Sequence, residues 1–174
     1  MRKEANKLKE ENFQYYKVIP LRSPAHIVDS SLPIPPPAND YADGSWTDWL
    51  DSPSLAKATY ISKVIEQFKE YTTVNLVRLL FLAPNSTVKE HKDPTLALEE
   101  KNSMIRLTVP IDINEGVEFY LNNELVPMNA GECWYLRLSD SHRVINNGTT
   151  DRINLTIDLI PNDKIIELIE KANK

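Results

Sequence analysis

The stretch His91-Lys92-Asp93 places a histidine and a carboxylate two residues apart. Side chains alternate along a strand, so in an extended stretch these two side chains point to the same side. His142 lies on a second β-like stretch, and Arg152 follows it along the chain. Two histidines and one carboxylate form the set that holds non-haem iron(II) and leaves positions open for substrate and oxygen. The arginine offers a planar fork for a carboxylate. The spacing therefore indicates a metal site beside an anion site.

The chain contains three histidines, at positions 26, 91 and 142. A lone histidine is more often structural than a ligand, and an H-x-D pair alone is a weak signal. The combination of His91, Asp93, His142 and Arg152 is much more specific than any of its parts.

These residues must be positioned by the β-like part of the chain, residues 72–160. Its apolar residues alternate, and from Met104 to Ile111 one face carries Arg106 and Thr108 while the other is aliphatic. Short strands at regular spacing, with turns between them, are typical of a β-sandwich or barrel. Helical patterns flank this region on both sides, after Ser52-Pro53 and after Asn162-Asp163.

The turn Asn147-Gly148 predicts a hairpin between residues 142–146 and 151–160. One face of the second strand is polar and the other is aliphatic. The polar face carries Arg152, Asn154, Thr156 and Asp158. Such a face is normally exposed to solvent, but in a barrel with a binding cavity it can line the interior. Arg106 and Thr108 can likewise either be exposed to solvent or line the interior of a barrel.

The length of 174 residues fits one domain, residues 1–174, with a β core over residues 72–160. Residues 1–45 are expected to form an N-terminal arm with a charged tail, an edge strand and a proline-rich segment. Pro33 to Pro36 fits a PxxP ligand pattern, although an extended segment lying over the domain is the more common explanation.

The net charge of −5 argues against nucleic acid or an anionic membrane surface as a partner. Cys133 is the only cysteine, which favours a reducing compartment. The N-terminus is charged and has no apolar core, so we expect no signal peptide and a cytoplasmic location. No apolar run is long enough to span a bilayer.

Residues 74–160 resemble the aspartyl/asparaginyl (and prolyl) β-hydroxylase family. The resemblance is carried by ordered motifs: Arg78-Leu79, Leu82-Ala83-Pro84-Asn85, His91-Lys92-Asp93, Arg106-Leu107-Thr108-Val109-Pro110-Ile111, Gly131-Glu132-Cys133-Trp134, Ser141-His142-Arg143-Val144 and Asp151-Arg152-Ile153-Asn154-Leu155. It implies a mainly β fold, a double-stranded β-helix (jelly roll, cupin-like) with flanking N- and C-terminal helices, which binds Fe(II) and the cosubstrate 2-oxoglutarate and uses O2.

On this resemblance, His91, Asp93 and His142 are the metal ligands, and Arg152 pairs with the distal carboxylate of 2-oxoglutarate. Arg106 contacts the cosubstrate or, as we favour, a carboxylate of the prime substrate. Thr108 stands where the family has a cosubstrate-binding histidine, so that hydrogen bond is supplied differently or lost.

The expected function is that of a 2-oxoglutarate-dependent dioxygenase, a hydroxylase acting on an unactivated carbon. Its substrate would be a free or modified amino acid, or an Asp, Asn or Pro residue in a peptide. Asp93 favours hydroxylation, since iron-dependent halogenases lack a carboxylate there. One alternative is a non-catalytic cupin-like metal- or ligand-binding domain. Arg152 is the discriminating residue, because a bare metal-binding module has no need of it. Another alternative is an interaction protein that reads peptides through its proline-rich arm.

Overall fold

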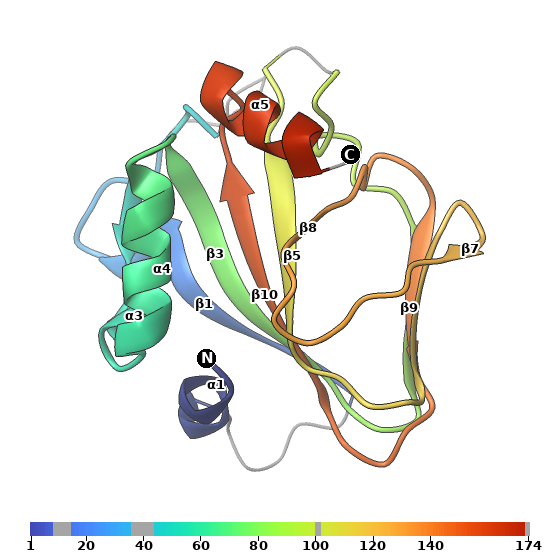
Figure 1. The fold of residues 1–174 in the computed structure, drawn as a ribbon. Helices are drawn as coiled ribbons and strands as arrows, with labels where there is room; N and C mark the ends of the chain where they lie inside the picture. The colour runs from blue at the N-terminus through green and yellow to red at the C-terminus, as the bar shows by residue number, and fades with distance from the viewer. Residues whose placement is uncertain (9–14, 36–43, 100–101, 173–174) are drawn as a thin grey trace.

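The computed structural model describes residues 1–8, 15–35, 44–99 and 102–172, which build two antiparallel sheets with helices on one side (Figure 1). The larger sheet has the order β2 (Trp49–Asp51), β1 (Tyr16–Pro24), β3 (Val74–Leu82), β10 (Arg152–Leu159), β5 (Ile105–Asp112), β8 (Trp134–Tyr135). The smaller sheet has the order β4 (Ser86–His91), β9 (His142–Asn146), β6 (Val117–Leu121), β7 (Glu124–Leu125).

Between β3 and β10 the chain passes repeatedly from one sheet to the other. Strands β3, β5, β8 and β10 belong to the larger sheet, and β4, β6, β7 and β9 belong to the smaller one. This winding, in two facing antiparallel sheets, is the double-stranded β-helix or jelly roll. The predicted fold class is confirmed, and β1 and β2 extend the larger sheet at one edge.

The hairpin predicted around Asn147-Gly148 is wrong. Strand β9 pairs with β4 and β6, whereas β10 pairs with β3 and β5 in the other sheet. The buried Asn146 side chain donates to the carbonyl oxygens of Leu82 and Thr150 at 2.9 Å each, which holds the connection as an arch. Consequently β9 and β10 face each other across the interior instead of lying side by side.

The helices are α1 (Arg2–Leu8), α2 (Ala25–Val28), α3 (Pro53–Ala56), α4 (Thr59–Lys69) and α5 (Asp163–Ala172). The helix expected after Ser52-Pro53 is divided into α3 and α4. The Ser52 hydroxyl donates to the carbonyl oxygen of Pro20 and does not cap α3. The cap at Asn162 is present, because its side-chain oxygen accepts from the backbone N–H of Ile165.

The larger sheet lies between two hydrophobic cores, one on each of its faces. The aliphatic residues of β3, β5 and β10 pack against buried side chains of the helices, such as Ile61, Ile65 and Ile165. The opposite face of the larger sheet meets the smaller sheet around Phe119 and Val144. Every residue of β10 is buried, so its polar face lines the interior between the sheets and is not exposed to solvent. The site is therefore held in the β-helix, and the helices cover the far side.

The N-terminal arm, for which an edge strand was predicted, supplies β1 to the larger sheet, where β2 is the outermost strand. Pro20 lies on the part of β1 that β2 leaves uncovered, since β2 pairs only with residues 22–24. This placement suits a residue that cannot donate a backbone hydrogen bond. The expected tail and proline-rich segment fall partly on residues 9–14 and 36–43, outside the described residues. In the described part of the chain, no helix is both long and apolar enough to cross a membrane.

Candidate metal centre

The structure brings His91, Asp93 and His142 together. One ligand atom from each residue lies within 4.8 Å of the others. His91 ends β4 and pairs directly with His142, which begins β9, so their rings lie 4.2 Å apart. Thus residues far apart in sequence meet because β4 and β9 are neighbours in the smaller sheet.

Asp93 reaches the cluster by a different route from the one that strand alternation predicts. Strand β4 ends at His91, after an irregularity between Val88 and His91, and Asp93 lies beyond its end. The backbone N–H of Asp93 donates to the carbonyl oxygen of Leu138 at 2.9 Å. This hydrogen bond, and not a strand register, places the carboxylate beside the two imidazoles.

Each histidine presents one ring nitrogen to the cluster. The Nδ1 atom of His91 lies 2.7 Å from the carbonyl oxygen of Lys89, and that of His142 lies 2.9 Å from the carbonyl oxygen of Asp140. A carbonyl can only accept, so each Nδ1 carries a proton, and in a neutral ring held this way the lone pair is on Nε2. Burial lowers the pKa of His142, with nearby His91 acting in the same direction. The neutral form is the one that binds metal.

Arg106 is anchored by carboxylates. Its Nε and Nη2 atoms donate to the two oxygens of Asp158 at 2.6 and 2.8 Å, and its Nη1 donates to Asp93 Oδ2 at 2.9 Å. Burial opposes the charged form, but the paired Asp158 and then Asp93 raise the pKa of Arg106. A substrate anion would have to share this guanidinium with two carboxylates, and the predicted substrate-binding role of Arg106 stays a prediction.

Arg152, unlike Arg106, is not anchored by a carboxylate of the described residues. It is 4% exposed, and among the described residues no hydrogen bond or ion pair reaches its guanidinium. Burial lowers the pKa of Arg152 to about 10, against a weaker opposing influence of Tyr16. The group is therefore a buried cation at neutral pH without a protein anion beside it, an arrangement that is unfavourable unless a ligand supplies the charge.

A cavity of about 80 Å³ connects these residues. It is lined by the three metal-ligand candidates, by Arg106, and by Arg152, Asn154 and Thr156 of β10. Two buried polar atoms of β10, Asn154 Oδ1 and Thr156 Oγ1, have no hydrogen-bond partner among the residues that the structure describes. Buried polar groups normally have partners, so these atoms point to a polar small molecule between Arg152 and the metal candidates.

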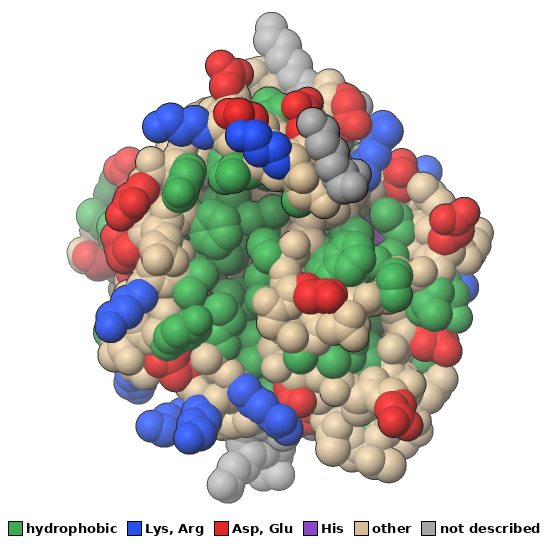
Figure 2. Space-filling model, viewed as in Figure 1, with side chains coloured by type: hydrophobic (Ala, Val, Ile, Leu, Met, Phe, Trp, Pro, Cys, Tyr) green, Lys and Arg blue, Asp and Glu red, His purple; other side chains and the backbone are tan. Residues whose placement is uncertain are grey.

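A larger hollow, about 510 Å³, lies elsewhere, between α5 and β8. Figure 2 shows the apolar side chains that gather on this face below α5. Its lining is mostly apolar, including Phe68, Leu107 and Ile165. Within the described ranges, the one cluster of three or more potential metal ligands is His91, Asp93 and His142. These three residues line the smaller cavity and not this hollow.

The residues present fit the group that the sequence implies. Two neutral imidazoles and one carboxylate are suited to a first-row divalent ion and leave other coordination positions free. Arg152 and the unpaired atoms of Asn154 and Thr156 suit an anionic, hydrogen-bonding cosubstrate. Thr108 is buried on the same wall, opposite Thr156 in the strand register, and carries a hydroxyl where the resemblance noted above would place a histidine.

Two residues of the site were missed in the sequence. Asp158 was noted only as part of a polar face, yet it is the main partner of Arg106. Its signal was available, because a carboxylate at an otherwise apolar strand end needs a buried cation nearby. Tyr16 also lines the cavity, from β1. Nothing in the sequence around it indicates that contact.

A family model described as aspartyl/asparaginyl beta-hydroxylase matches residues 45–161. Among solved structures, a predicted oxalate decarboxylase from Thermotoga maritima is 24% identical, with 55% of this chain and 74% of that chain covered and a TM-score of 0.39. A cupin domain of a transcriptional regulator from Enterobacter cloacae is 16% identical, with 53% and 87% covered and a TM-score of 0.40. These likenesses are distant, and the fold assignment rests on the strand order described above.

Proposed function

The chain belongs to the aspartyl/asparaginyl β-hydroxylase family, and from this premise we propose that it is an Fe(II)- and 2-oxoglutarate-dependent dioxygenase. It would hydroxylate an unactivated carbon of an amino-acid-type substrate, either a free or modified amino acid or an Asp, Asn or Pro residue of a peptide. The observation that carries the proposal is Arg152, a buried cation without a described partner, in the same cavity as His91, Asp93 and His142.

His91, Asp93 and His142 would hold the iron through two Nε2 atoms and a carboxylate oxygen. Arg152 would bind the distal carboxylate of 2-oxoglutarate, and Asn154 and Thr156 line the cavity with hydrogen-bonding groups that it could use. The chemistry that iron, 2-oxoglutarate and O2 supply when bound is the insertion of one oxygen atom into a carbon–hydrogen bond, with the other oxygen atom in succinate and release of CO2. Phe119 lies parallel to the His142 ring and forms an apolar part of the cavity wall.

A non-catalytic metal-binding domain is less well supported. Such a domain needs the three ligands, but it gains nothing from a buried cation beside them. An unpaired buried charge destabilises a folded protein, so its presence requires a compensating ligand. Arg152 therefore favours the enzyme over the bare metal site.

The test is succinate formation from 2-oxoglutarate by the Fe(II)-loaded chain under air, with and without a panel of free amino acids and short peptides. We expect succinate from the wild type, increased by one member of the panel. Asp93→Ala should abolish it. Arg152→Met should raise the KM for 2-oxoglutarate, and Arg22→Met, which changes an arginine outside the cavity, should not. No succinate from the wild type with any member of the panel would count against the proposal, as would an unchanged KM in Arg152→Met.

A further inference from the structure

Asp158 is a carboxylate for which the proposed reaction has no direct use. Its side chain is 1% exposed and lies at the end of β10, opposite Arg106 in the strand register. Both of its oxygens accept from Arg106, at 2.6 and 2.8 Å. A second arginine, Arg78, approaches no closer than 4.0 Å. Two parallel hydrogen bonds of this kind fix the plane of a guanidinium as well as its position.

The guanidinium of Arg106, held in this way, also donates a hydrogen bond to Asp93, one of the candidate metal ligands. With Nε and Nη2 on Asp158, Arg106 has its Nη1 directed at Asp93 Oδ2, at 2.9 Å. One oxygen of Asp93 is thereby engaged by the protein, and the other is left for a metal ion. Asp93 needs such support because it lies beyond the end of β4, with its side chain 31% exposed.

We propose that Asp158 is a positioning residue of the metal centre: through Arg106 it orients the Asp93 carboxylate for coordination through a single oxygen. The inference rests on the proposed metal site but not on the identity of the substrate. Residues that orient metal ligands typically change metal affinity by about 10- to 100-fold when they are replaced. An effect of that size is expected here, although Asp158 itself touches no metal.

The experiment is a Co(II) titration of the metal-free full chain, followed by the visible absorption of the bound ion. Asp158→Asn should weaken Co(II) binding about 10- to 100-fold and alter the absorption bands, because Asp93 is free to rotate. In an Asp93→Ala background the same change should have no further effect, since the ligand through which Asp158 acts is gone. A role in folding alone would not produce this dependence on Asp93.

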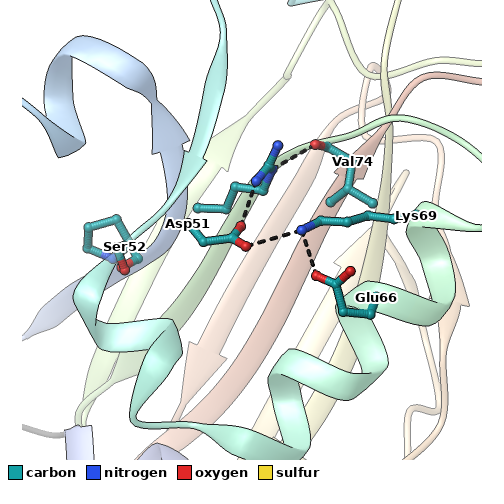
Figure 3. A network of polar contacts seen from close by, with 7 residues as sticks. Asp51, Ser52, Glu66, Lys69 and Val74 are labelled. Carbon is teal, nitrogen blue, oxygen red and sulfur yellow. Dashed lines mark hydrogen bonds and ion pairs between the residues drawn. The ribbon is translucent and has the colours of Figure 1, made fainter. Parts of the chain in front are cut away.

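The chain offers a matched control at its surface. Asp51 also accepts from an arginine, Arg22, at 2.6 Å, in a network with Lys69 and Glu66 (Figure 3). None of these four residues lines the cavity. Asp51→Asn should leave Co(II) affinity and spectrum unchanged. If Asp158→Asn does not fold, Arg106→Lys provides the same test, because an ammonium cannot fork between two carboxylates.

The possible results separate the two proposals. Wild-type affinity and spectrum in a folded Asp158→Asn or Arg106→Lys protein would overturn the positioning role and leave the metal site intact. An equal loss from Asp158→Asn in the presence and absence of the Asp93 carboxylate would also overturn it. No Co(II) binding by the wild type, or equal binding by Asp93→Ala, would overturn the metal site itself.

Discussion

Two arginine–aspartate contacts in this molecule share the same shortest distance, but they differ in the number of hydrogen bonds and in their surroundings. Arg106 Nε lies 2.6 Å from Asp158 Oδ1 in the interior, and Arg22 Nη1 lies 2.6 Å from Asp51 Oδ1 at the edge of the larger sheet. The Asp158 side chain is 1% exposed, whereas that of Asp51 is 40% exposed. Distance alone therefore does not rank the contacts, because the cost of leaving a carboxylate unpaired depends on how far water has been removed from it.

The comparison extends to the cations of the cavity. Arg106 is balanced by two carboxylates of the chain, while Arg152, at the other end of β10, has none among the described residues. Of these two arginines, one is thus paired with carboxylates of the protein, and the other has no anionic partner among the described residues. The surface network, by contrast, is open to water and salt on its outer side.

The largest effect is expected at the interior pair. Arg106→Met should lower the free energy of unfolding by about 3–5 kcal/mol, because it removes both hydrogen bonds of the buried Asp158 carboxylate and leaves Arg78, 4.0 Å away, as its nearest cation. Urea unfolding at neutral pH measures the loss. Adding Asp158→Leu to this variant should restore much of the stability, since a buried pair replaced by apolar groups is often nearly neutral. If Arg106→Met alone were as stable as the wild type, water would have to reach Asp158.

The second effect concerns the unpaired cation. Arg152→Met should reduce the affinity for 2-oxoglutarate by about tenfold to a hundredfold, the equivalent of roughly 1.5–3 kcal/mol for a charge-assisted pair. Its free energy of unfolding without ligand should be unchanged or higher, because a buried charge without a partner is removed. Calorimetric titration and urea unfolding of the same preparation measure both.

Arg152→Lys should recover only part of the affinity, because an ammonium lacks the planar fork. A large loss of stability in Arg152→Met with normal 2-oxoglutarate binding would reverse the comparison. It would assign to Arg152 the structural role that we give to Arg106.

Much of the fold could be predicted from the sequence, because alternation and turn residues are local signals. The aliphatic positions of β5 and β10 and the cap at Asn162 are examples. The pairing of β9 could not be predicted, since a short Asn-Gly turn is compatible with a hairpin and with an arch between sheets. The arch depends on Asn146, whose contacts with Leu82 and Ala83 are distant in sequence.

The candidate site, too, could be predicted only in part from the sequence. Residue types and spacing selected His91, Asp93, His142 and Arg152, and the structure places all four around one cavity. What the sequence could not provide is the partner of each charge. Whether Arg106 binds Asp158 or a substrate depends on a cross-strand register, and whether Arg152 has an anion depends on every element packed around it.

A third carboxylate, Glu4, is bound by backbone donors instead of an arginine, and its effect should be smaller. Its oxygens accept from the N–H groups of Tyr60 and Ile61 at the start of α4, at 2.6 and 3.0 Å. Glu4→Gln should lower the free energy of unfolding by about 1 kcal/mol, the size of a helix-capping contact. Urea unfolding measures it, and a loss as large as that of Arg106→Met would contradict the ranking by burial.

The smallest effect is expected at the surface network, in Asp51→Asn. Partial burial opposes ionisation, but hydrogen bonds from Arg22 and then Lys69 outweigh it and lower the pKa of Asp51. Exposed pairs contribute about 0.2–1 kcal/mol, and salt screens them. Because the folded-state pKa is lowered, the contribution is fully present above the ordinary value of 3.8 and is lost as the pH falls through the lowered folded-state value. Urea unfolding of wild type and Asp51→Asn should therefore differ most at neutral pH and low salt, and converge in strong acid or about 1 M salt. A difference above about 2 kcal/mol that salt does not reduce would mean that Asp51 is as well shielded from water as Asp158, and the contrast between the two contacts would fail.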